Sequence, residues 1–168
     1  DSFSSVSYAN NNGSANWTTS WVETDSNGGG ASSGYINVTS GRLRIETDSV
    51  GNNIYRQVDI SGATTATLSF QYDNQLNGED EINVAVSNNG GSSYTVIKSY
   101  SGSLNTGVGS ESIDISSYIS SNTRIRFYVV KNDQAGPVFI DNVQITFNVT
   151  PTGGTTAFSA ATGSSSIT

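Results

Sequence analysis

Two charged side chains fall on the apolar phase of predicted strands. Arg56 alternates with the apolar residues of segment 54–60, and Asp141 alternates with those of segment 139–147. Because burying an ionised side chain without a partner costs several kcal/mol, each should meet an opposite charge, a hydrogen-bonded network or a metal. Two interpretations of Asp141 stay open: an ion pair, with Arg56 as the candidate partner, or a place among the ligands of a calcium ion.

The sequence restricts a metal site to oxygen ligands, since it contains no histidine and no cysteine. Oxygen ligands favour calcium or magnesium, and calcium accepts carboxylates, amide oxygens, backbone carbonyls and water. The N-terminal stretch 1–14 and segment 23–25 are rich in such groups, and no EF-hand loop is present. We therefore expect a structural Ca²⁺ site assembled from distant segments, with the candidate ligands Asp141, Asp1, Asn12, Glu23 and Asp25.

Enzymatic chemistry has few candidates in this sequence. Without histidine or cysteine there is no Ser-His-Asp triad and no Cys-His pair. Glycoside hydrolysis needs two carboxylates that face each other, whereas Glu79, Asp80 and Glu81 are neighbours at the entry of one predicted strand. We expect no catalytic residues and no enzymatic activity.

A binding site for a glycan or a peptide has better candidates. Sugar sites combine flat aromatic surfaces with planar hydrogen-bonding side chains. In segment 123–130, Arg124, Arg126 and Tyr128 alternate with apolar residues, which predicts that they lie on the solvent side of a strand. The candidate ligand-binding residues are Arg126, Tyr128, Gln71, Asp73, Asn132 and Asp133, and we expect the first four to share one outer face.

The composition indicates an extracellular protein. The 168 residues carry 7 basic and 14 acidic side chains, a net charge of −7, so nucleic acid and anionic membrane surfaces are not expected partners. No apolar stretch is long enough to cross a membrane. A surface rich in Ser, Thr, Asn and Gly, with no cysteine or methionine, is typical of secreted and cell-surface proteins. The expected location is therefore secreted or at the cell surface.

Short alternating segments separated by Gly, Asn and Ser predict an all-β protein. Segment 87–94, Ser-Asn-Asn-Gly-Gly-Ser-Ser-Tyr, predicts a hairpin. Ten strands favour an antiparallel jelly-roll β-sandwich over a smaller immunoglobulin-type sandwich. The predicted strands are Trp17–Glu23, Tyr35–Thr39, Arg42–Glu46, Asn53–Ile60, Ala66–Tyr72, Glu81–Ser87, Tyr94–Ser99, Glu111–Ile115, Thr123–Val130 and Val138–Val149.

Residues 1–149 resemble bacterial extracellular jelly-roll modules, which are similar to MAM, galactose-binding-like and carbohydrate-binding domains. The resemblance depends on the opening Asp1-x-Phe3, the paired Trp17 and Trp21, and the ending Ile-Asp-Asn-Val-Gln-Ile at 140–145. It implies a non-catalytic binding or adhesion module of a larger protein, with a structural calcium ion near Asp141 and Asp1. The alternatives are a structural spacer and an accessory domain of a secreted hydrolase.

The tail, 150–168, has a different composition. Segment 150–156 reads as a linker, and segment 157–168 is similar to the opening strand of a fibronectin type III module. The sequence therefore predicts one module over 1–149 followed by a linker, and leaves two interpretations of the rest: the start of a neighbouring module of the same longer chain, or an ordinary flexible Ser/Thr tail.

Overall fold

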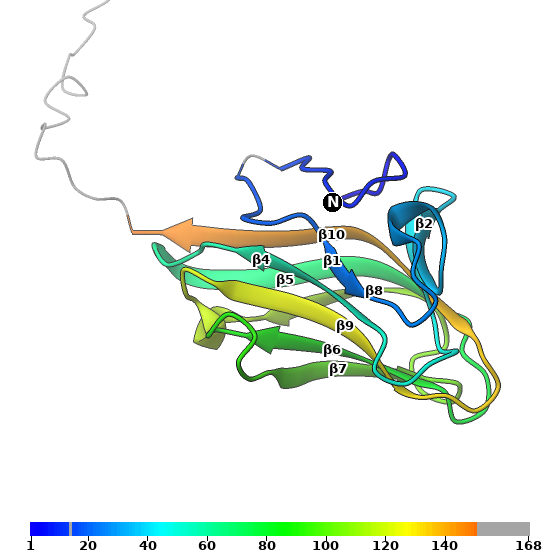
Figure 1. The fold of residues 1–168 in the computed structure, drawn as a ribbon. Coiled ribbons are helices and arrows are strands. Elements are labelled where there is room, and N and C mark those ends of the chain that lie inside the picture. Colours follow the sequence, from blue (N-terminus) through cyan, green and yellow to red (C-terminus); the bar gives the residue numbers. More distant parts are fainter. Residues whose placement is uncertain (14, 151–168) are drawn as a thin grey trace, which may run out of the picture.

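The computed structural model describes residues 1–13 and 15–150, so the predicted linker after Thr150 and the fibronectin-like strand lie outside the described residues. Two antiparallel five-stranded sheets pack face to face (Figure 1). The predicted all-β jelly-roll sandwich is confirmed. The strands are β1 (Val22–Thr24), β2 (Ile36–Thr39), β3 (Arg42–Glu46), β4 (Asn53–Val58), β5 (Ala63–Asn74), β6 (Glu81–Ser87), β7 (Thr95–Ser101), β8 (Gly107–Asp114), β9 (Thr123–Lys131) and β10 (Pro137–Val149).

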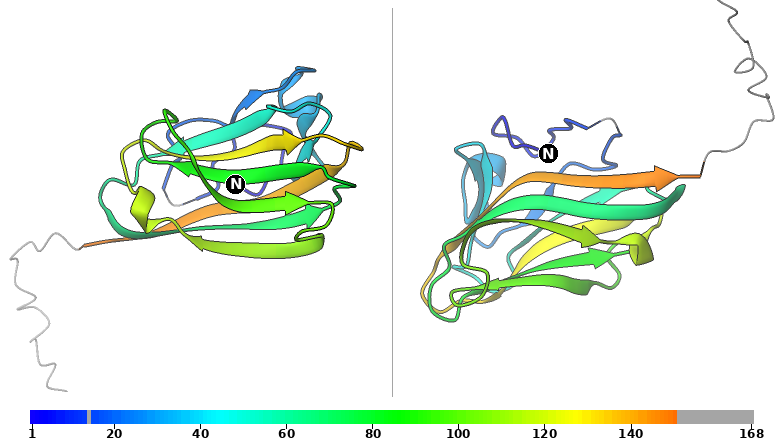
Figure 2. Two further views of the ribbon diagram at one scale, coloured as in Figure 1. Left: turned by 90° about the horizontal axis from the view of Figure 1, so that it is seen from below. Right: turned by 180° about the vertical axis from the view of Figure 1, so that it is seen from behind.

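The first sheet has the strand order β1-β4-β9-β6-β7, and the second has the order β2-β3-β10-β5-β8. Figure 2 shows the second sheet from behind, with the long strand β10 in orange. Two short 3₁₀ helices, η1 (Gly30–Ser32) and η2 (Ser116–Tyr118), lie in the connections. Except in the pairs β2–β3 and β6–β7, neighbouring strands are not consecutive in the sequence. The outer faces are therefore assembled from separate segments.

Alternating side chains build the core between the sheets. In β9, Ile125, Phe127 and Val129 are buried, whereas the residues between them are partly exposed. The Phe127 ring packs edge-on against the ring of Phe70 of the other sheet, with centroids 5.6 Å apart. Such aromatic pairs add to the stabilisation that burial of apolar area supplies.

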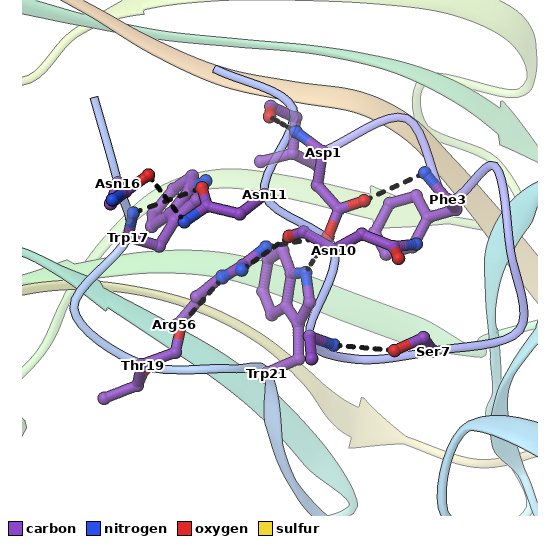
Figure 3. A network of polar contacts seen from close by, with 12 residues as sticks. Asp1, Phe3, Ser7, Asn10, Asn11, Asn16, Trp17, Thr19, Trp21 and Arg56 are labelled. Carbon is purple, nitrogen blue, oxygen red and sulfur yellow. Dashed lines mark hydrogen bonds and ion pairs between the residues drawn. The ribbon is translucent and has the colours of Figure 1, made fainter. Parts of the chain in front are cut away.

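Arg56 points into the core, as the sequence predicts. Its Nη1 atom donates to Oδ2 of Asp1 over 2.7 Å, and both side chains are almost completely buried (Figure 3). Its remaining donors bond to the carbonyl oxygens of Thr19 and Asn10, and the same Asp1 carboxylate accepts the indole N–H of Trp21. The ion pair therefore ties the N-terminal segment to β4. The partner of Arg56 is Asp1, and the suggested pairing with Asp141 is wrong.

The prediction that Asp141 points inward is also wrong, because β10 contains a bulge. The register with β5 shifts between Asp141 and Gln144, and Asn142 has a φ of 51°. The extra residue reverses the phase of the strand. Ile140 before the bulge and Val143 after it both face the core, while Asp141 stays partly exposed on the outer face.

All ten predicted strands are present, although the first is much shorter than expected. Only Val22–Thr24 pairs with β4 as a strand, and the preceding residues of the predicted strand 17–23 form a loop. This loop is held by single hydrogen bonds, from Thr18 to the carbonyl of Gln57 and from Trp21 to that of Tyr8. Trp21 is buried at the end of this loop, outside any strand ladder.

Candidate functional site

The outer surface of the first sheet carries three tyrosines and two arginines from three parts of the chain. Figure 1 shows β4, β9, β6 and β7 side by side, the strands that form this surface. Tyr55 of β4 lies opposite Arg126 of β9, which in turn lies opposite Ala85 of β6. We call the surface formed by these aromatic and basic residues the tyrosine–arginine face; it comprises Tyr55, Tyr94, Arg124, Arg126 and Tyr128.

The side chains of this face stack on one another. The guanidinium carbon of Arg126 lies 3.8 Å from the ring centre of Tyr94 and 4.4 Å from that of Tyr128. The guanidinium carbon of Arg124 lies 4.4 Å from the ring centre of Tyr55. Cation–π contacts of this kind hold long arginine side chains in defined positions. The face is therefore a platform in which aromatic rings and guanidinium groups contact one another.

The β6–β7 hairpin places Tyr94 on the platform. The Ser87 hydroxyl accepts the backbone N–H of Asn89 and of Gly91, and the Asn89 side-chain oxygen accepts the N–H of Ser93. Gly91 has a φ of 89°, and a Cβ there would lie only 2.8 Å from the hydroxyl of Tyr94. The glycine therefore allows both the turn and the close approach of the tyrosine.

Two polar atoms on this face have no hydrogen-bond partner. They are Nε of Arg126 and Oδ1 of Asn83, a residue that is 7% exposed. Asn83 lies opposite Tyr128 and donates from its amide nitrogen to the Tyr128 hydroxyl over 3.4 Å. Both atoms are shielded from solvent, so a group from outside the chain could reach them only if the side chains that cover them moved.

Gln71 and Asp73 do not share this face with Arg126 and Tyr128. Both belong to the second sheet, and their outward side chains lie on the opposite side of the sandwich. There Asp73 pairs with Arg42 over 3.0 Å, and Arg42 stacks 4.1 Å from the ring centre of Phe139. The expected single face is therefore wrong: alternation identifies outward side chains, but it does not assign strands to sheets.

Asn132 and Asp133 follow β9 in a loop at one end of the sandwich. The Asn132 amide donates to the carbonyl of Asp48, and an Asp133 carboxylate oxygen accepts the N–H of Glu79. The backbone N–H of Asp133 donates in turn to the buried carboxylate of Asp80 over 2.6 Å. These contacts join the loop after β9 to the loops before β4 and before β6, and neither residue belongs to the tyrosine–arginine face.

Of the candidate calcium ligands, Asp1 and Asn12 line one hollow with Asn142, the neighbour of Asp141, whereas Glu23 and Asp25 do not line it. The carboxylates already accept hydrogen bonds from donors of the chain. Asp1 accepts from Arg56 and Trp21, and Glu23 accepts from Tyr8 and the N–H of Gly30. Asp25 accepts from the N–H groups of Asn27 and Ile36. Asp141 accepts the N–H of the neighbouring Asn142, and Asn12 is exposed.

No group of three or more acidic side chains that could hold a metal occurs within residues 1–13 and 15–150. The five residues thus do not fit a shared site in this arrangement, and calcium binding stays a prediction from the sequence.

A groove of about 390 Å³ lies between the N-terminal segment and the end of β10. Trp17 and Phe147 contribute aromatic rings to its lining, and Gln144 and Thr146 contribute exposed polar side chains. Arg56 lies beside Trp17, with its guanidinium carbon 5.1 Å from the ring centre, and it donates to Asp1, Thr19 and Asn10. The groove therefore has aromatic and polar walls but no unpaired arginine.

Sequence reasoning identified two residues of the tyrosine–arginine face as ligand candidates and missed its other partners. The sequence pattern places Tyr94 at the end of a hairpin and places Tyr55 and Asn83 within strands, and it predicts no binding role for these three residues. The useful signal was the position of Tyr94 directly after a tight glycine turn, which brings it back over the strand. The pairing of β4, β9 and β6 that unites these residues is not readable from local pattern.

No protein-family model matches the chain, and no curated protein matches it. Solved structures share its fold at low identity. A xylan-binding module, CBM15, is 13% identical with a TM-score of 0.56, over 80% of this chain and 94% of that module. The K2 cleaved adhesin domain of Lys-gingipain is 15% identical with a TM-score of 0.52, over 88% of this chain and 97% of that domain.

A CBM4 module is 16% identical with a TM-score of 0.50, over 76% of this chain and 94% of that module. These likenesses establish the jelly-roll sandwich as the shared property. Within the part of the chain that the structure describes, no helix has the length and apolarity needed to span a membrane.

Proposed function

We propose that the protein is a non-catalytic binding module that holds a glycan on its tyrosine–arginine face. The observation that carries the proposal is the stack of Tyr94, Arg126 and Tyr128 on the outer side of the first sheet. Sugars present two kinds of surface: apolar C–H patches that pack on aromatic rings, and hydroxyls that both donate and accept hydrogen bonds. The face offers a partner for each.

The accessible polar groups of the face suit a ligand with many hydroxyls. Of the Arg126 nitrogens only Nε is buried without a partner, so its two terminal N–H₂ groups can donate to a ligand. A hydroxyl carries two acceptor lone pairs and can accept from them. The chemistry of the face therefore favours a polyhydroxylated ligand over an apolar one.

The fold supports the proposal, and the acidic residues of the first sheet argue against hydrolysis. The five strands of that sheet contain only Glu23 and Glu81 as acids, and Glu23 lies opposite Ile54, on the inner side. A glycosidase needs two carboxylates flanking one bond. Carbohydrate-binding modules and an adhesin domain share the sandwich, which favours a binding role in a secreted or cell-surface protein.

Glycan-array binding followed by calorimetry tests the proposal. Tyr94→Ala and Tyr128→Ala should each weaken binding at least tenfold, or about 1.4 kcal/mol. Phe139→Ala is the matched control, because Phe139 also stacks on an arginine but belongs to the opposite sheet. Its affinity should equal that of the unchanged protein. Absence of any glycan signal would instead favour the structural-spacer alternative.

A further inference from the structure

The charge of the tyrosine–arginine face points to a more specific ligand, and this inference rests on the proposed function. We infer that the bound glycan carries carboxylate groups, as uronic-acid polysaccharides do, and that Arg126 and Arg124 bind them.

Most basic side chains of the protein are already neutralised. Four of the seven lysines and arginines form ion pairs: Arg42 with Asp73, Arg44 with Glu46, Arg56 with Asp1, and Lys98 with Glu111. Among the described residues, Arg124, Arg126 and Lys131 pair with no acid. Two of these three lie next to each other on the tyrosine–arginine face, in a chain whose net charge is −7.

The two sheets differ in their acidic side chains. On the first sheet the outward acid of the strands is Glu81, which begins β6 and lies opposite Lys131 rather than beside Arg126. The outer side of the second sheet carries Glu46, Asp73, Asp114 and Asp141, of which the first two pair with Arg44 and Arg42 of the same side. Two acids thus remain without an ion pair on the second sheet, whereas two arginines remain without one on the first. This difference in charge favours the first sheet as the face that binds an anionic ligand.

The arginines keep donors available for a carboxylate. Rings that stack on a guanidinium cover its planar faces and leave the in-plane N–H groups free. Arg124 uses Nε to donate to Gln57 over 2.8 Å, and Nε of Arg126 is buried, so the terminal N–H₂ groups are the donors available to a ligand. A guanidinium edge binds a carboxylate through two parallel, charge-assisted hydrogen bonds, which are stronger than bonds to the hydroxyls of a neutral sugar. The Tyr128 hydroxyl remains for the hydroxyls of the same sugar.

The decisive experiment compares glycans that differ only in charge. Calorimetry of the unchanged protein is done with oligogalacturonate, alginate and hyaluronan oligosaccharides and with the carboxyl-reduced form of each. At least one uronate oligosaccharide should bind ten or more times as tightly as its reduced form. Added salt should weaken the binding of the uronate. A sulfated oligosaccharide without uronic acids is also tested. If any anion were sufficient, it would bind as tightly as the uronate.

The variant Arg126→Gln should remove the preference for the charged form while keeping weak binding of the reduced form. Arg44→Gln, on the opposite sheet, is the matched control and should leave the preference unchanged. Equal affinity for a uronate and its reduced form, equal affinity for the sulfated glycan, or binding of neutral glycans alone would overturn this inference and leave the proposed function standing. Failure of every glycan to bind would overturn both.

Discussion

Arg56 and Asp1 form an ion pair of 2.7 Å whose side chains are only 2% and 0% exposed. A pair this deeply buried contributes little net stabilisation compared with apolar residues, but removing one partner leaves an uncompensated charge. The pair also fixes where the N-terminal segment lies, because the same carboxylate receives Trp21 and the backbone of Phe3. Stability of the sandwich and placement of that segment are thus coupled.

Replacing Arg56 by methionine should therefore destabilise the protein by about 3–5 kcal/mol. The substitution leaves the Asp1 carboxylate and two backbone carbonyls without the hydrogen bonds that Arg56 donates to them. Urea unfolding measures the effect. Arg44→Met is the matched control, because the partly exposed Arg44–Glu46 pair should contribute less than about 1 kcal/mol. Similar losses in both variants would contradict the importance assigned to the buried pair.

A methyl group at position 109 should disturb the closure of the β7–β8 side of the sandwich. Gly109 lies opposite Tyr72, and a Cβ there would come within 2.4 Å of the tyrosine hydroxyl. The Tyr72 ring in turn packs 4.7 Å from that of Tyr100. Gly109→Ala should cost about 1–3 kcal/mol through overpacking. Gly62→Ala is the control: no atom lies within 4 Å of the added methyl group, so the melting temperature should change little. An unchanged melting temperature of Gly109→Ala would contradict the prediction and show that the Tyr72 ring can move aside.

Two buried tyrosines should make the protein sensitive to alkali. Burial, the Glu111 charge and its hydrogen bond raise the pKa of Tyr100 above its ordinary 10.0, and burial with a hydrogen bond to Glu23 does the same for Tyr8. The folded chain holds these protons more tightly than the unfolded chain, so this contribution is complete below pH 10 and is lost as the pH rises above it.

Tyrosinate absorbance should therefore show a fraction of phenols that ionises only together with unfolding. Tyr100→Phe and Tyr8→Phe should each reduce that late change. Ionisation of all eight tyrosines in a reversible step before circular dichroism reports unfolding would contradict the burial of these hydroxyls.

Calcium binding, expected from the sequence, has a direct test in chelation. A ligand that binds only the folded state stabilises it, by about 2.7 kcal/mol at a hundred times its dissociation constant. EDTA should then lower the melting temperature, and readdition of calcium should restore it. An unchanged melting temperature, with no metal found by elemental analysis, would show that the carboxylates are satisfied by donors of the chain alone.

The local pattern of the sequence was sufficient for the strands and for most side-chain directions. Two-residue alternation located all ten strands and correctly placed Arg56 inward and Arg126 outward, because both properties depend only on neighbouring residues. It failed at Asp141, since the bulge in β10 inserts a residue and reverses the phase. A bulge depends on pairing with β5, which is distant in sequence.

What the sequence alone determined is an acidic, all-β sandwich without imidazole or thiol chemistry, together with the residues that must point outward. Only the tertiary structure decided that Asp1 neutralises Arg56, that Gln71 and Arg126 lie on opposite faces, and that Tyr94 stacks on Arg126. Composition and alternation are local properties. Ion pairs and platforms depend on which strands become neighbours, and that choice minimises exposed apolar area over the whole chain.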